Sequence, residues 1–284
     1  MRRLALKSMS LTSIKKFSSN PYIWITLNHI SLFVIITLFF NFQRTFETCM
    51  ISVCYIIGLD LLLRKLSGRM PKFELNHLLS PIVTGVSLTI LLNSSSLGLY
   101  LMAGTIAVVS KYIIQSDGKH FFNPSLIGIV GCYALSEVNW LGIQSDQFMI
   151  VDHIAIQLFV VGFITLYFAK RLLLPLLYFS FMIVGGLFFH HFGGIDLIIM
   201  MGPDLSASGM LFAFFMMTDP KTSPKSTRNK IIFVASIVLI NLVVTSFGAP
   251  HGNFIGLFIV NYFMMLAYLG NKIGITKVSK PVEA

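Results

Sequence analysis

Long apolar runs recur along this chain of 284 residues. They fall at about 22–42, 46–63, 78–93, 96–115, 122–137, 150–169, 172–190, 196–218, 230–247 and 252–270. A helix that crosses a bilayer needs about 20 apolar residues, and most of these runs approach that length. The composition agrees, because 55% of the residues are hydrophobic and only 11% are charged, whereas about a quarter of a soluble domain is charged. The sequence therefore predicts an all-α integral membrane protein with about ten transmembrane helices.

The placement of the basic residues predicts how these helices are oriented. With about ten spans and a cytoplasmic N-terminus, every Lys and Arg except Arg44 falls on the cytoplasmic side, which is the pattern that the positive-inside rule describes. Both termini are then cytoplasmic, and the expected location is the cell inner membrane. Because topology accounts for the net charge of +10, the lipid bilayer is the expected partner and no nucleic acid is needed.

The chain divides into a basic cytoplasmic segment (1–20), a polytopic membrane domain (21–270) and a cytoplasmic tail (271–284). The membrane domain splits into two halves, at about 21–138 and 150–270. Since each half holds an odd number of spans, we expect two inverted repeats. The third run contains Pro81 and the eighth contains Gly202-Pro203, and interrupted helices at matching positions indicate a site near the bilayer midplane. The alternative is that these residues only kink ordinary helices.

The stretch "SDGKHFFNPSLIGIV", residues 116–130, separates two apolar runs. Asn123 is suited to cap a helix, and Pro124 followed by Ser125 is suited to its first turn. Lys119 and His120 precede this helix start, whose positive dipole end favours an anionic group. The alternative is a capped helix with solvated flanking charges, which local physics alone favours.

A second polar segment, residues 212–230, is expected on the same side of the membrane. Thr218 and Asp219 end an aromatic and methionine-rich run, Thr222 adds a hydroxyl and Lys221 adds a positive charge. A carboxylate at a membrane helix edge is costly unless it is paired. Asp219 therefore distinguishes this segment from an ordinary basic loop.

Two further acidic residues lie within apolar runs and are candidates for an ion pathway. Asp60 lies about one turn from the cytoplasmic end of its span, where pairing with Arg64 at i+4 is the alternative that we favour. Asp204, together with Asp196, is expected to line an outer vestibule. The three cysteines lack the spacing of a metal clamp, so no metal site is predicted.

The segments "GKHFFNPSLIGIV" (118–130) and "SGMLFAFFMMTDPKTSPKSTRNKIIF" (208–233) resemble two families of membrane subunits. These are the D subunit of Rnf-type electron-transport complexes and the B subunit of the sodium-pumping NADH:quinone reductase. "LSPIVTGVSLTILL" (79–92) resembles the third span of that family, and "SFGAPHGNFIGLFIVNYF" (246–263) its final hairpin. The residues of the KHFFNPS and TDPKTSP motifs are most similar to those of stand-alone Rnf-D-like membrane proteins, such as those of enediyne biosynthetic clusters.

The resemblance implies an inner-membrane subunit that handles flavin and couples electron transfer to sodium or proton movement. Redox partner subunits would supply the electrons, so the chain is not expected to be a complete enzyme alone. A non-covalent flavin, FMN or riboflavin, would lie between the two polar segments. The residues implied for this cofactor site are Lys119, His120, Asn123, Pro124, Ser125, Thr218, Asp219, Lys221 and Thr222.

The chain departs from the family at the connection between the halves. The family attaches FMN to a threonine there, whereas residues 137–150 read "EVNWLGIQSDQFMI" and contain no threonine. The nearest similar tetrapeptide, Ser206-Ala207-Ser208-Gly209, also ends without threonine. The sequence therefore predicts no covalent FMN. A transporter or channel without a redox role is the alternative function, and a membrane anchor for a soluble redox enzyme is a third.

Overall fold

The structure, a computed structural model, describes residues 21–39, 46–69, 76–92, 94, 96–116, 119–135, 152–248 and 252–273. The connection at 137–150, where no covalent FMN is predicted, lies outside these residues, as do residues 1–20 and the tail beyond Ile273, where α13 ends. The first half holds α2 (Pro21–Phe39), α3 (Phe46–Leu66), α4 (Asn76–Leu91), α5 (Leu97–Ile113) and α6 (Pro124–Leu135). The second half holds α8 (Asp152–Phe168), α9 (Leu173–Gly193), α10 (Leu197–Leu205), α11 (Ala207–Leu211), the π-helix η2 (Phe212–Met216), α12 (Thr227–Ser246) and α13 (Gly252–Ile273).

The all-α class is confirmed for the described residues, whose only strands are the short antiparallel pair β1 (Gln115–Ser116) and β2 (Lys119–His120). Every apolar run of the sequence contains a helix. Among the described residues, four helices (α3, α9, α12 and α13) are long and apolar enough to cross a membrane. The segment from α10 to Met216 makes a fifth if the bent pair is one span. The chain is thus a membrane protein, while the count of ten spans and the inverted repeats stay predictions.

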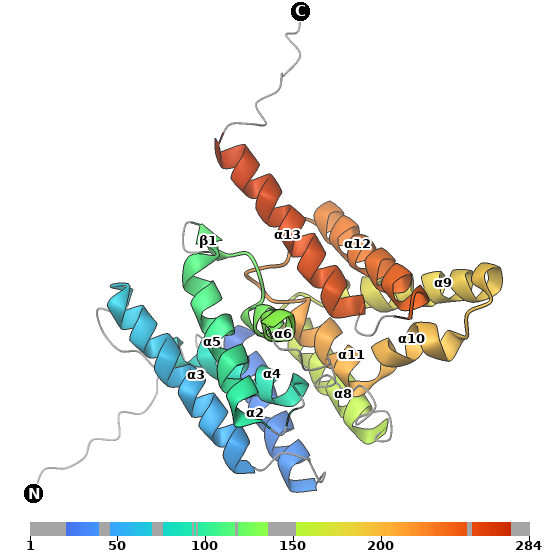
Figure 1. The fold of residues 1–284 in the computed structure, drawn as a ribbon. Coiled ribbons are helices and arrows are strands. Elements are labelled where there is room, and N and C mark those ends of the chain that lie inside the picture. Colours follow the sequence, from blue (N-terminus) through green and yellow to red (C-terminus); the bar gives the residue numbers. More distant parts are fainter. Residues whose placement is uncertain are drawn as a thin grey trace, which may run out of the picture.

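The helices form two groups, seen in Figure 1 as α2–α5 and α9–α13, with α6 between them. Contacts between the halves run from α6 to α13 and from α2 to α8. Within the first half, α6 packs closely on α5 at Gly128. A Cβ at this position would lie only 2.5 Å from the Ala103 carbonyl oxygen, so no larger residue fits without a shift. Small residues at such crossings let membrane helices approach closely.

The outward faces of the longer helices are apolar. Val184 and Phe192 of α9 are 68% and 73% exposed, and Leu239 of α12 is 60% exposed. A soluble monomer rarely exposes such continuous apolar surface, whereas lipid tails solvate it without cost. The exposure pattern thus agrees with the length and composition of the helices.

The two irregular runs differ from each other. In the third, α4 continues through Pro81 without a break. The eighth is broken, but at Ser206 rather than at Gly202-Pro203, and its two parts meet at 60°. The Ser206 hydroxyl donates to the Pro203 carbonyl, 2.6 Å away, and so satisfies an acceptor near the break.

Candidate functional site

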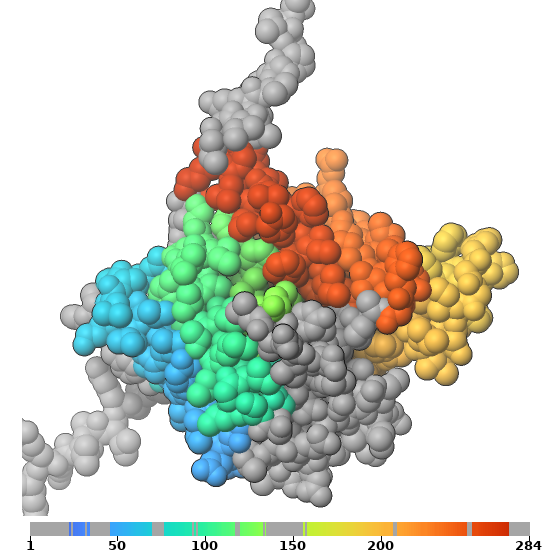
Figure 2. Space-filling view, in the orientation of Figure 1, coloured from blue at the N-terminus to red at the C-terminus, as the bar shows by residue number. Residues whose placement is uncertain are grey.

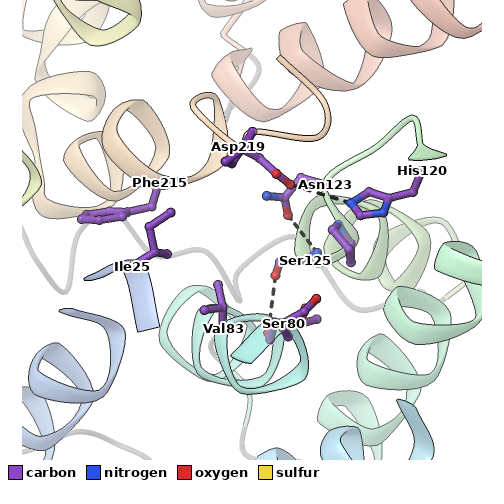
Figure 3. A pocket seen from close by; sticks show the side chains of 11 residues that line it. Ile25, Ser80, Val83, His120, Asn123, Ser125, Phe215 and Asp219 are labelled. Atoms are coloured by element: carbon purple, nitrogen blue, oxygen red, sulfur yellow. Dashed lines mark hydrogen bonds and ion pairs between the residues drawn. The ribbon is translucent and has the colours of Figure 1, made fainter. Parts of the chain in front are cut away.

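A small cavity lies where the two polar segments of the sequence meet, and Figure 3 shows its lining side chains. The cavity measures about 40 Å³. Its walls come from α2, α4, the β2–α6 segment and the segment from η2 to α12. The lining residues are Ile25, Ser80, Val83, Thr84, His120, Asn123, Pro124, Ser125, Phe215, Asp219 and Pro220.

The first wall is the start of α6, whose geometry is that of a capped helix. The Asn123 side-chain oxygen accepts from the backbone N–H of Ser125 at 3.0 Å and of Leu126 at 3.4 Å. The Ser125 hydroxyl donates to the Thr84 carbonyl of α4, 3.4 Å away. Since Asn123 already occupies two N–H groups that an anion would use, the helix start itself does not favour an anion site.

The second wall is the loop after η2, which Asp219 organises. One carboxylate oxygen of Asp219 accepts from the Lys221 N–H at 2.9 Å. The Asp219 carbonyl accepts from the N–H groups of Thr222 at 3.3 Å and Ser223 at 3.0 Å. These bonds form a compact turn, which fixes the direction of the Asp219 side chain toward the first wall.

Arg171, in the turn between α8 and α9, holds this loop from behind. Its guanidinium donates to the Ser223 hydroxyl at 2.6 Å, the Thr218 carbonyl at 3.3 Å and the Pro220 carbonyl at 3.4 Å. Our sequence reasoning did not single out Arg171, because a basic residue there reads as an ordinary positive-inside signal. Its three loop contacts show a positioning role.

Asp219 and His120 meet across the cavity. The second Asp219 oxygen lies 4.0 Å from the His120 Nε2, as Figure 3 shows. Burial acts to raise the pKa of Asp219, but His120, the Lys221 N–H and the Lys221 charge together outweigh burial and hold this pKa below its ordinary value. A carboxylate at this position was expected to need a partner, and the partner of Asp219 is His120, from the other half of the chain.

The remaining residues of the predicted cofactor site lie elsewhere. Thr218 is buried and its hydroxyl donates to the Phe214 carbonyl. Thr222 is buried without lining the cavity, and Lys221 is exposed away from it. Lys119 pairs with Ser116 in the strand pair, and its side chain lies outside what the structure describes. The structure thus brings together only His120, Asn123, Pro124, Ser125 and Asp219.

The cavity is smaller than the pockets that usually hold cofactors. Pockets for cofactor-sized ligands measure about 300–1,000 Å³, whereas this one measures about 40 Å³. A water molecule needs about 10–15 Å³ on the same scale, so the cavity suits water molecules or one small ion. Among the described residues, no group of three His, Cys, Asp or Glu side chains is arranged to hold a metal.

Two further residues line the cavity although the sequence did not predict them as site residues. Phe215 belongs to the π-helix η2 and meets His29 of α2 edge-on, with ring centroids 5.1 Å apart. Single π-helical turns often mark functional sites, but no local sequence pattern predicts them. Ile25 faces the cavity from α2, which the sequence treats only as an apolar span.

Asp60, the first candidate for an ion pathway, is buried in an ion-pair cluster. Its carboxylate lies 2.9 Å from Arg64 and 3.3 Å from Lys111 of α5. The Tyr112 hydroxyl donates to the Asp60 carbonyl at 3.0 Å. The Arg64 pair is the alternative that the sequence favoured, and Lys111 is an additional partner that only the packing of α5 on α3 reveals.

Asp204, the second candidate, is 3% exposed and does not line an outer surface. Asp204 therefore does not contribute its carboxylate to an outer vestibule, because α9 and α12 cover it, whereas Asp196 is exposed. Tyr178 of α9 donates its hydroxyl to one oxygen, and the Asn241 amide of α12 donates to the other at 2.9 Å. Gly209 lies against this residue, since a Cβ there would meet the Asp204 carbonyl oxygen at 2.2 Å.

Comparison with known proteins adds no identification. A scan against protein-family models and a search of curated proteins find no match for this chain.

Proposed function

We propose that this protein is the membrane subunit of an Rnf- or Nqr-like electron-transport system that couples electron transfer to ion movement across the cell inner membrane. One observation carries the proposal. The two segments with the family resemblance, far apart in the sequence, meet at one cavity, where His120 and Asp219 are 4.0 Å apart. An acid–base pair beside room for water or a small ion is suited to ion coupling.

The chemistry at this cavity concerns an ion rather than a flavin. Asp219 is an anionic group whose only described side-chain partner across the cavity is His120, and Asn123 and Ser125 add polar atoms to the wall. A proton or small cation that reaches Asp219 would change the charge facing His120. Non-covalent FMN or riboflavin is not assigned to this cavity, and any electrons come from partner subunits.

The proposal is tested by ion uptake into membrane vesicles from cells that do or do not produce the protein. We expect uptake that depends both on the protein and on an added reduced donor such as NADH. Donor-driven uptake of equal rate in both vesicle preparations would overturn the proposal. An absorbance spectrum of the purified protein tests the flavin part separately, and the size of the cavity predicts no stoichiometric flavin there.

A transporter or channel without a redox role is the second candidate. The missing threonine favours it, because residues 137–150 contain no threonine to which FMN could be attached. The cavity of about 40 Å³ is compatible with both candidates, since it accommodates an ion or water. Purified protein in proteoliposomes without a donor distinguishes the two candidates. Ion flux under these conditions would support the transporter, whereas flux that requires a donor and partner subunits would support the electron-transport subunit.

A further inference from the structure

An open groove runs between α12 and α13, away from the Asp219 cavity. It measures about 860 Å³. Both helices are long and apolar enough to cross a membrane, and Figures 1 and 2 show them side by side in orange and red. The lining residues are Pro224, Lys225, Ser226, Asn229, Ile232, Phe233, Ser236, Leu239, Ile240, Ile259, Val260, Phe263, Met264 and Ala267.

The chemistry of the groove changes along its length. At the start of α12 it is lined by Lys225, Ser226 and Asn229, and farther along mostly by aliphatic and aromatic side chains, with one hydroxyl at Ser236. The apolar part is open, since Leu239 is 60% exposed and Phe263 is 63% exposed. A groove that is basic and polar at one end and apolar along the rest matches an amphipathic ligand.

The length of the apolar part matches one leaflet of a bilayer. Asn229 and Ile240 both line the groove, and a rise of 1.5 Å per residue puts them roughly 16 Å apart along α12. The hydrocarbon core of a bilayer is about 30 Å thick, so this is about half of it. The polar end is the one that the charge distribution assigns to the cytoplasmic surface.

We propose that this groove binds an anionic phospholipid of the cytoplasmic leaflet, with an acyl chain along the apolar part and the phosphate near Lys225. Charge complementarity selects the headgroup: Arg228 and Lys230 lie in the first turns of the same helix, and that first turn contains no acidic residue. Basic side chains near a membrane surface favour anionic lipids. This inference does not depend on the proposed electron-transport function.

Native mass spectrometry of the full-length protein in detergent tests the proposal. The probes are phosphatidylglycerol and phosphatidylcholine with identical acyl chains. We expect one phosphatidylglycerol molecule to bind about five-fold more tightly than phosphatidylcholine, because one basic residue near the headgroup contributes about that factor. Lys225→Gln should remove most of this preference, because Lys225 is the one basic residue among those that line the groove. Lys65→Gln, an exposed residue of α3 outside the groove, should keep it.

Filling the groove provides an independent variant. Ala267 lines the groove and is exposed, so Ala267→Trp adds a large side chain without displacing buried atoms. It should remove the bound lipid. Ala235→Trp is the matched control, because Ala235 is exposed on α12 and does not line the groove.

Equal binding of both lipids to the wild-type protein would overturn the proposal, as would lipid binding that survives Ala267→Trp. A dimer or a protein complex that Ala267→Trp dissociates, with no bound lipid, would also overturn it and assign the groove to a protein partner.

Discussion

Asp60 and Asp204 are both buried carboxylates on apolar helices, but they are stabilised in opposite ways. Asp60 has two cationic partners, Arg64 and Lys111. Asp204 has neutral partners, Tyr178, Asn241 and Asn253, and no ion pair with any described residue. A buried charge is costly without a counter-charge. The first half thus holds a buried ion pair, and the second half a buried carboxyl that contacts only neutral groups among the described residues.

The largest effect should come from neutralising Asp60. Asp60→Asn leaves Lys111 buried without its counter-charge, and removing one partner of a buried pair costs about 3–5 kcal/mol. We expect a correspondingly large drop in the thermal unfolding midpoint of the detergent-purified protein. Lys111→Met in the same protein should recover part of the loss, and Glu47→Gln, at the exposed start of α3, should be close to neutral. A midpoint for Asp60→Asn equal to that of Glu47→Gln would contradict the structural role.

The Asp204 region should be sensitive to shape rather than to charge. Gly209→Ala places a Cβ against the backbone of Asp204, and such overpacking costs about 1–3 kcal/mol. Gly58→Ala in α3 is the matched control, because no atom lies within 4 Å of its added Cβ. If the two variants unfold at the same temperature, the helix break at Ser206 is not tightly packed.

Neutralising Asp204 gives the sharpest contrast with Asp60. Asp204→Asn keeps one oxygen acceptor but turns the other oxygen into an NH2 group that faces a donor, Tyr178 or Asn241. We therefore expect a loss of about 1–3 kcal/mol, the cost of one buried donor without an acceptor and less than the loss for Asp60→Asn. The same thermal unfolding assay compares it directly with Asp60→Asn. A loss as large as that of Asp60→Asn would show that the fold needs the Asp204 charge.

A smaller, pH-dependent effect is expected for Asp219, which lies outside both clusters. Because its pKa in the folded protein is below the ordinary value of 3.8, the ionised form stabilises the fold. This contribution is present above about 3.8 and is lost as the pH falls through the lower folded-state pKa. The difference in unfolding midpoint between wild type and Asp219→Asn should therefore shrink in this acidic range. If the difference in unfolding midpoint grows as the pH falls, the ionised form of Asp219 does not stabilise the fold.

The sequence predicted the helices well, because the apolar runs and their charged ends depend on local composition. It also predicted the cap at Asn123 and the i+4 pair of Asp60 with Arg64, which are local interactions. Contacts between helices were not predictable in this way. Packing between distant segments decides three of the pairs: Asp60 with Lys111, Asp204 with Asn241 and Asp219 with His120. No local pattern in the sequence predicts such packing.

The cofactor prediction likewise depends partly on local sequence and partly on packing between helices. The two polar segments were expected to form one site, and the structure brings His120 and Asp219 together. The volume between them is set by α2 and α4, through Ile25 and Val83, which the sequence shows only as apolar positions. The polar residues therefore indicated which segments meet, but not how large the cavity between them is.

Donor-driven ion uptake by vesicles containing Asp219→Asn tests the central claim most directly. If the cavity between the two halves couples electron transfer to ion movement, uptake should fall at least about ten-fold, as expected for loss of an essential ionisable group. Glu47→Gln, produced at the same level, should keep the wild-type rate. Wild-type uptake by the Asp219→Asn vesicles would contradict the claim.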